Sequence, residues 1–538
     1  MIKEKVDTAS VQLFRQKTIL LGGMALTVLL VVLYALNKGI VFSDESWYLL
    51  HLRLPDAVIP YSQWHAYALK LFPEGILAIR IVTVLLLLLS GIIFSLCLTW
   101  KGSFTIFQAL TTSIIGLFVL FMPVQFVPNY MTFNSIILFA GSGLYILALR
   151  VDTKKLVVIF SVLAGIIYGQ LFFVMITNMA IYGMLIILPF LIQERKTAFI
   201  NVLALFSGTI IGFLLFFWSI KGLEQFYHET LMAFKYHAFD ESHGIKDLVK
   251  WSISTFTYIV KEVALPAILL LIIKWGKNIN LKVKSVTIAV LVLYFLVITL
   301  TDLRTNFRNI TPPTIILSIA TFIIADLFIN KNYREALIGL FCLFIPFFGC
   351  LGTDVNFSIR ASLYSLPIIV FVLQYAIVNS QKKTFFFLIF FLLFATLRFS
   401  IQFTNASGWN GYRLSQQKIA LSELNADEAI KLDQKRFNSL KELQTIINPG
   451  DTMLVSHHNL WGYVYLSEGV TPLLQFKFNE ERLDFYFKQN QLQKTKLALI
   501  EDTDNPFPEG YVQSFGFKNY RLHQLKSNSG LNVYILNN

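Results

Sequence analysis

The chain has 538 residues, of which 55% are hydrophobic and only 14% are charged, and its mean hydropathy is +0.62. This composition excludes a soluble globular protein of this size and indicates a polytopic membrane protein. The net charge of +13 does not call for a nucleic-acid partner, because the basic residues gather in short loops between apolar segments.

Apolar segments long enough to cross a bilayer recur throughout residues 1–400. They lie near 17–37, 76–98, 104–123, 131–149, 156–176, 177–193, 198–220, 253–275, 282–300, 314–330, 335–351, 362–379 and 384–400. We therefore expect about thirteen membrane-spanning helices. The boundary at Thr177-Asn178 divides one long apolar stretch, so a tight turn is needed there.

Lysine and arginine occupy every second loop. These basic loops are Lys101 and residues 150–155, 193–197, 274–284, 330–335 and 380–385. Loops of this kind face the cytoplasm, so the longer segments at 38–75, 221–252, 301–313 and 352–361 are expected outside. We predict a multi-pass protein of the cytoplasmic (inner) membrane, with a transmembrane domain at 1–400 and an extracytoplasmic domain at 401–538.

The final segment alternates two kinds of pattern. Strand-like pieces occur at 452–456, 496–501 and 532–537, and helical patterns at 417–447 and 459–469. This alternation predicts a small α/β domain. The chain is therefore expected to be an all-α polytopic membrane protein with an α/β domain at its end.

The first outer loop carries two adjacent carboxylates, Asp44 and Glu45, directly after the first apolar segment. Further along, "YSQWHAYALKLF" at 61–72 places Trp64, Tyr67, Ala68, Leu71 and Phe72 on one helical face, with Ser62 as the N-cap. This pattern predicts an amphipathic helix in the membrane interface, and residues 223–239 predict a second one. The two carboxylates should then lie at the bilayer surface, where partial desolvation raises their proton affinity.

This loop resembles the GT-C class of membrane glycosyltransferases. The resemblance rests on the acidic pair in "SDESWYLLHL", on "SQWHAYALKLF", and on the Gly-x-x-x-Gly helix in "LAGIIYGQLFF" at 163–173. The class includes protein O-mannosyltransferases, aminoarabinose transferases and the catalytic subunit of oligosaccharyltransferase. It implies an inverting transfer, on the outer face, of a sugar from a polyprenyl-phosphate or polyprenyl-diphosphate carrier to a lipid, glycan or protein acceptor.

By that resemblance Asp44 is the catalytic carboxylate, which accepts the proton of the acceptor hydroxyl, and Glu45 is its alternative or helper. The lipid phosphate is already a good leaving group, so the site needs positive charge on the phosphate rather than a general acid. Arginine forks suit phosphate oxygens. The candidate substrate-binding residues from the outer loops are His65, Tyr130, Lys235, His237, Arg304, Arg308 and Arg360.

No dedicated metal site is predicted. The second outer loop, "PVQFVPNY" at 123–130, lacks the second acidic residue that several members of the class place there. Asp44, Glu45 and His65 are ligand types that a hard divalent cation accepts, so such a cation is left open as a cofactor.

Two other functions fit a protein of this composition. An O-antigen-type polysaccharide polymerase or ligase would show one dominant outer loop late in the chain. A lipid-linked sugar transporter or flippase would show internal repeats and charges at mid-membrane. Of these signals the sequence shows only Lys261 and Glu262, inside a predicted span.

Overall fold

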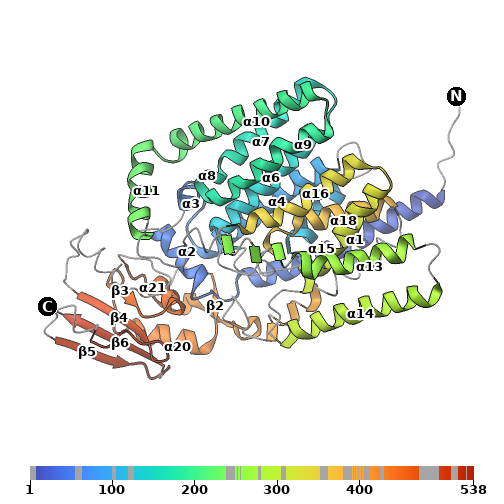
Figure 1. Cartoon of the computed structure of the whole chain (residues 1–538). Helices are drawn as coiled ribbons and strands as arrows, with labels where there is room; N and C mark the ends of the chain where they lie inside the picture. Colours follow the sequence, from blue (N-terminus) through green and yellow to red (C-terminus); the bar gives the residue numbers. More distant parts are fainter. Residues whose placement is uncertain are drawn as a thin grey trace.

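The structure is a computed structural model of the whole chain (Figure 1). It describes residues 8–54, 63–99, 105–118, 126–237, 249–250, 253–254, 256–257, 259–276, 280–304, 311–351, 362–379, 391, 393, 395–397, 399–401, 403–404, 412–424, 429–471, 496–510, 519–528 and 530–537. Most of the chain forms a bundle of long helices, and a sheet closes one end of it (Figure 1).

Within these residues, twelve of the predicted apolar segments form helices. They are α1 (Thr8–Leu36), α4 (Ile76–Leu98), α5 (Ile106–Phe118), α6 (Tyr130–Arg150), α7 (Lys154–Gly169) with α8 (Leu171–Val174), α9 (Ile181–Ile192), α10 (Arg195–Leu215), α13 (Ala264–Trp275), α14 (Leu281–Arg304), α15 (Thr311–Ile329), α16 (Tyr333–Cys350) and α18 (Leu366–Asn379). Most of the predicted segment at 384–400 lies outside the described residues.

Seven of the described helices are long and apolar enough to span a membrane, and the other apolar helices are shorter. Their outward faces carry large apolar side chains, of which Trp218 is 88% exposed and Leu214 is 64% exposed. Such surfaces are stable only against lipid. The prediction of an integral multi-pass membrane protein with a small sheet domain at its end is confirmed.

The long apolar stretch at 156–193 divides as the sequence required. The helix α7 ends at Gly169, Met175 is extended, and a 3₁₀ turn, η2 (Ile176–Ala180), leads into α9. The helices α7 and α10 then pack closely through glycines. A Cβ atom on Gly165 would lie 2.1 Å from the Leu205 carbonyl oxygen, and one on Gly208 would lie 2.1 Å from that of Val162.

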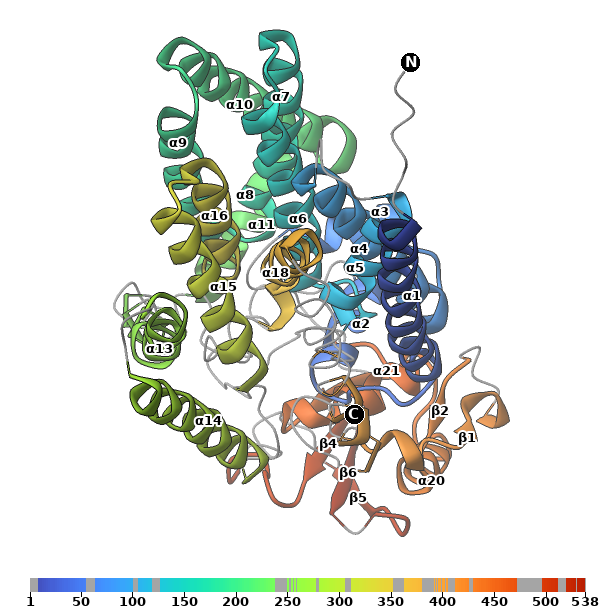
Figure 2. The ribbon, with the colours of Figure 1, turned by 90° about the vertical axis from the view of Figure 1, so that its right-hand side faces the viewer.

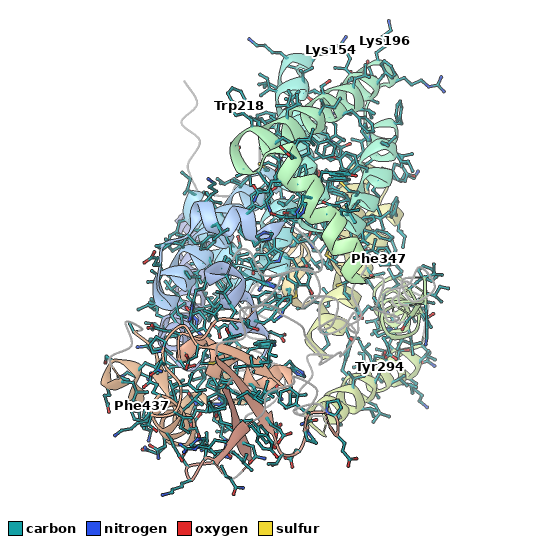
Figure 3. All side chains as sticks on the ribbon, turned by 90° about the vertical axis from the view of Figure 1, so that its left-hand side faces the viewer. Lys154, Lys196, Trp218, Tyr294, Phe347 and Phe437 are labelled. Carbon is teal, nitrogen blue, oxygen red and sulfur yellow. The ribbon has the colours of Figure 1, made fainter. Side chains whose placement is uncertain are left out.

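Three short helices lie at the end of the bundle that also carries the sheet. They are α2 (Asp44–Arg53), α3 (Trp64–Leu71) and α11 (Leu223–His237), and α11 runs across the direction of α10 (Figures 1 and 2). At the opposite edge from the sheet domain's Phe437, Lys154 and Lys196 reach outward from the starts of α7 and α10 (Figure 3).

The predicted interfacial helix at 61–72 forms as α3, but its details differ. Its N-cap is Gln63 rather than Ser62, because the first helical residue is Trp64. Trp64 and Ala68 are buried inside the protein and Leu71 is exposed. The apolar face therefore packs against neighbouring protein as well as facing outward.

The C-terminal region holds a four-stranded sheet in the order β3-β4-β6-β5. The strands β3 (Thr452–Val455), β4 (Lys496–Asp502) and β6 (Leu531–Asn537) match the three predicted ones, and β5 (Asn519–Gln524) was not predicted. The strand β3 runs parallel to β4, and the other pairs are antiparallel. The helix α21 (Trp461–Leu466) confirms the second helical pattern.

The predicted helix at 417–447 is wrong in its first half. There the strands β1 (Ile419–Ala420) and β2 (Lys431–Leu432) form a short antiparallel pair, and α20 (Gln434–Leu443) is the only α-helix among the described residues of this segment. Asp433 caps α20 by accepting a hydrogen bond from the Arg436 N–H. A capping aspartate directly after β2 starts the helix later than the apolar pattern suggested.

Replacing Gly165 by valine should force α7 and α10 apart, because the new side chain would meet backbone that cannot move aside. We expect a loss of about 3 kcal/mol in the free energy of unfolding, the upper end for overpacked cores. Gly183 of α9 is the matched control, since nothing lies within 4 Å of a Cβ added there. Thermal unfolding in detergent measures both variants, and equal stability of the two would refute the close packing.

Candidate active site at the sheet-bearing end of the bundle

The acidic pair lies at the start of α2, and seven residues separate it from the end of α1. Asp44 is the first residue of α2 and is half-buried, whereas Glu45 is completely buried. The free backbone N–H groups of a helix N-terminus favour negative charge, so this position stabilises an ionised carboxylate. The two neighbours therefore have different surroundings although they are adjacent in sequence.

Glu45 is held by Arg80, which projects from the first turns of α4. The Arg80 Nε and Nη2 atoms donate to Glu45 Oε1 over 2.8 and 2.5 Å, and the Val41 N–H donates to Glu45 Oε2 over 2.9 Å. Burial raises the pKa of Glu45, and the Arg80 guanidinium and the Val41 N–H act in the opposite direction. Both carboxylate oxygens thus accept hydrogen bonds that hold Glu45 in place.

Arg80 also binds the chain that leads from α1 to α2. Its Nη1 donates to the Leu36 carbonyl over 2.6 Å and its Nη2 to the Gly39 carbonyl over 2.9 Å. The side chain is 1% exposed. One guanidinium therefore connects the end of α1, the following loop and the acidic pair to α4.

The C-terminal region packs on the same loop from the other side. The Gly39 N–H donates to the Lys431 carbonyl, and the Gly462 N–H donates to the Phe42 carbonyl over 2.9 Å. Gly39 has φ of +60°, and a Cβ there would lie 2.4 Å from the Tyr412 ring. At the other end of α2, the Arg53 guanidinium donates to the Tyr465 carbonyl, and its Cζ atom lies 3.9 Å from the centroid of the Tyr465 ring. The position of Asp44 thus depends on the C-terminal region as well as on the bundle.

His65 lies in a buried polar cluster that the sequence did not predict. Lys221, directly after the helical segment that continues α10, donates to Gln63 Oε1 over 2.7 Å, pairs with Glu229 of α11, and lies 3.4 Å from His65 Nε2. Burial lowers the pKa of Lys221, and Glu229 opposes this effect. The cluster fastens α11 to α3. One sign of this cluster is visible in the sequence: Lys221 follows the apolar segment 198–220, on the predicted outer side of the membrane, where basic residues are few.

Aromatic rings fill the space between α2, α3 and α6. The Tyr48 ring lies 5.6 Å from Trp64 and 6.2 Å from Tyr130, between centroids, and Tyr130 is half-buried. The buried His51 ring lies 4.1 Å from Trp47, and neither of its nitrogens has a hydrogen-bond partner in the described part of the chain. Burial and the nearby His65 hold the pKa of His51 well below its usual value, so His51 is neutral.

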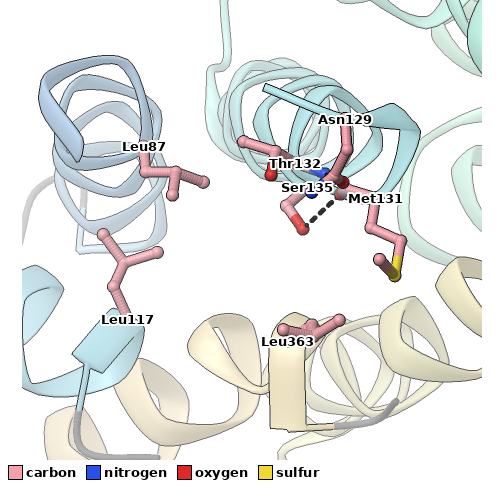
Figure 4. A pocket seen from close by; sticks show the side chains of 7 residues that line it. All are labelled: Leu87, Leu117, Asn129, Met131, Thr132, Ser135 and Leu363. Carbon is pink, nitrogen blue, oxygen red and sulfur yellow. Dashed lines mark hydrogen bonds between the residues drawn. The ribbon is translucent and has the colours of Figure 1, made fainter. Parts of the chain in front are cut away.

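A small pocket of about 10 Å³ lies inside the bundle next to the start of α6 (Figure 4). Its lining residues are Leu87, Leu117, Asn129, Met131, Thr132, Ser135 and Leu363. Asn129 caps α6 by accepting from the Thr132 N–H, and the Ser135 hydroxyl donates to the Met131 carbonyl. The pocket has room for roughly one water molecule and none for a sugar.

The remaining predicted residues are only partly described. Lys235 and His237 belong to α11 and Arg304 is the last residue of α14, in each case with the backbone alone described. Arg308 and Arg360 lie outside the described residues. The geometry thus brings Asp44, Glu45, His65 and Tyr130 to one end of the bundle, and the contacts of the five basic residues stay predictions.

The described residues contain no group of three or more His, Cys, Asp or Glu side chains placed to hold a metal ion. Asp44 and the Arg80-bound Glu45 do not form a pair of free carboxylates.

No protein-family model matches the sequence, and no curated protein matches it. Among solved structures, the oligosaccharyltransferase of Archaeoglobus fulgidus in the apo form matches 90% of this chain and 70% of its own, with 11% identity and a TM-score of 0.45. ArnT from Cupriavidus metallidurans, bound to undecaprenyl phosphate, matches 96% of this chain and 97% of its own, with 8% identity and a TM-score of 0.37.

Another structure of the Archaeoglobus fulgidus enzyme, AglB, in complex with an inhibitory peptide and a dolichol-phosphate, has 12% identity, a TM-score of 0.42, and coverage of 90% of this chain and 69% of its own. A further one contains Zn and sulfate. Both kinds of enzyme belong to the GT-C class, which the first outer loop resembles. These TM-scores are below 0.5, so the role of each residue is argued from the contacts within this chain alone.

Removing the guanidinium by Arg80→Met should strand a buried charge on Glu45 and release the loop behind α1. We expect a loss of about 3–5 kcal/mol in the free energy of unfolding. The double variant Arg80→Met with Glu45→Gln should recover part of it, and Arg195→Met, at an exposed position of α10, should have little effect. Thermal unfolding in detergent compares the three; a double variant no more stable than Arg80→Met would contradict this explanation.

Proposed function

We propose that the protein transfers a sugar from a polyprenyl-phosphate or polyprenyl-diphosphate carrier to an acceptor hydroxyl, at the end of the bundle that carries the sheet domain. The observation that carries the proposal is the division of the acidic pair. Glu45 is locked by Arg80, while Asp44 is half-buried at the N-terminus of α2. A fixed and partly desolvated carboxylate at a membrane surface is suited to accept a proton.

The proposed step needs one proton acceptor and one site for phosphate. Asp44 accepts the proton of the acceptor hydroxyl as its oxygen attacks the anomeric carbon. The bond from that carbon to the phosphate oxygen breaks, and the electron pair leaves with the lipid phosphate. Attack opposite the leaving group inverts the anomeric centre. The phosphate is an adequate leaving group without protonation, so a second carboxylic acid is not required.

Positive charge for the phosphate is proposed to come from Arg304, Arg308 and Arg360, with Lys235 and His237 on α11 as further candidates. All five lie in the segments 221–252, 301–313 and 352–361, which the charge pattern predicts to be outside. Guanidinium forks bind phosphate oxygens in pairs and keep their charge at a membrane surface. His65 and Tyr130 are proposed to contact the sugar or the acceptor.

We also propose that this end of the bundle is extracytoplasmic and that the membrane is the cytoplasmic one. The helix α10 runs from its basic first turn, with Arg195 and Lys196, to α11 at the end of the bundle that carries the sheet domain (Figure 1). Basic loops stay on the cytoplasmic side, which puts the acidic pair and the sheet domain outside.

Changing Asp44 to asparagine should remove the proton acceptor and keep the volume of the side chain. We expect transfer to fall about 10²–10⁴-fold with an unchanged melting temperature. The assay is mass spectrometry of lipids and glycans from a deletion strain that carries each variant. The strain with Asp44→Asn should lack the same glycoform as the deletion strain and accumulate the carrier-linked sugar.

Glu194→Gln, an exposed carboxylate at the start of α10, is the control and should restore the glycoform. A transporter or flippase would tolerate the loss of Asp44. Full restoration of the glycoform by Asp44→Asn would therefore reject the transferase mechanism.

A further inference from the structure

Two lysines face each other where the end of α1 meets the C-terminal region. Lys38 and Lys431 form an isolated parallel β-bridge. The Gly39 N–H donates to the Lys431 carbonyl over 2.8 Å, and the Lys431 N–H donates to the Asn37 carbonyl over 3.0 Å. Residues paired in this way project to the same side of the ribbon, so two ammonium groups share one space.

No carboxylate in the described part of the chain forms an ion pair with either lysine. The Lys38 Nζ donates to the Gln417 carbonyl over 3.4 Å and lies 5.0 Å from the Tyr34 ring centroid. Asp433, two residues beyond Lys431, caps α20 and binds Arg436 instead. Burial and the charge of Lys431 lower the pKa of Lys38. Directly opposed like charges destabilise a strand pair, and the carboxylates of the described residues supply no counter-charge here.

The location indicates which anion would relieve the repulsion. The outward face of α1 is apolar up to its last turn, with Leu30 57% exposed and Tyr34 40% exposed. Lys38 follows within one turn and extends along Tyr34, as a residue does at the level of lipid headgroups. Arg413 and Lys418, both exposed, lie in the chain shortly before β1, the strand that pairs with β2 and Lys431. A phosphate at this depth belongs to a membrane lipid.

We propose that Lys38 and Lys431 form a binding site for the phosphate of an anionic phospholipid. The lipid headgroup would bridge the two ammonium groups and join the end of α1 to β2 of the C-terminal region. This site is separate from the proposed transfer reaction, which uses Asp44 and the outer-loop arginines. The inference therefore stands or falls independently of the proposed function.

The test measures the melting temperature of the purified full chain in neutral detergent, with added phosphatidylglycerol, phosphatidylcholine or inorganic phosphate. Phosphatidylglycerol should raise the melting temperature by about 2–4 °C, and the other two should raise it much less. The variant Lys431→Glu should remove this rise, because a carboxylate would pair with Lys38 in place of the lipid. Lys431→Gln should remove it as well.

The two variants differ in a second readout that a bulk charge effect would not change. Without added lipid, both variants lose the repulsion, and Lys431→Glu should melt at a higher temperature than Lys431→Gln, because only the carboxylate can pair with Lys38. Lys435→Gln, an exposed lysine on α20, is the control and should keep the full response to phosphatidylglycerol.

Three results would overturn the proposal. One is an equal rise with inorganic phosphate, which would make this a site for free anions. Another is an equal loss of response in Lys435→Gln, which would reduce the effect to net charge. The third is an undiminished response in Lys431→Glu.

Discussion

The buried ion pair between Arg80 and Glu45 is the contact on which the geometry of this end of the bundle depends. Both side chains are 1% exposed or less. Taking two charges out of water is costly, and the cost is recovered only when the remaining hydrogen-bonding atoms are satisfied. Here Arg80 reaches the carbonyls of Leu36 and Gly39 as well as Glu45. The last turn of α1 has carbonyls without helical partners, so Arg80 also supplies a C-terminal cap to that helix.

The C-terminal region completes the same arrangement through small residues. Gly39 and Gly462 permit the rings of Tyr412 and Phe42 to lie directly on the backbone, where a side chain would collide. Backbone hydrogen bonds from both glycines then cross between the loop and the C-terminal region. The region is thereby a structural part of the candidate site, although the sequence offered no motif that assigned it a role.

The sequence predicted the elements whose signals are local. A membrane span is recognised by about twenty consecutive apolar residues, and the strands β3, β4 and β6 by short apolar runs. The sequence therefore predicts the spans and these three strands. The strand β5, "NYRLHQ", was missed because it is an exposed edge strand with polar residues at four of its six positions. The acidic pair could be singled out from its place after a span. Its partner Arg80 lies 35 positions away, and only the fold brings the two together. An arginine inside an otherwise apolar span was nevertheless a visible signal that a buried anion had to exist. For Lys221 and Glu229 the signal is weaker: they are two opposite charges close to the break between the segment that ends at Ile220 and α11.

The division between Asp44 and Glu45 follows from helix geometry. Successive residues of an α-helix project about 100° apart, so a helix that buries one of two adjacent side chains turns the other toward its edge. Arg80 fixes the direction of Glu45, and the contact between Arg53 and Tyr465 fixes the far end of α2. With both ends of the helix constrained, the backbone position of Asp44 at the start of α2 is fixed. An adjacent acidic pair can in this way place one carboxylate in a buried ion pair and leave the other half-buried at the helix end.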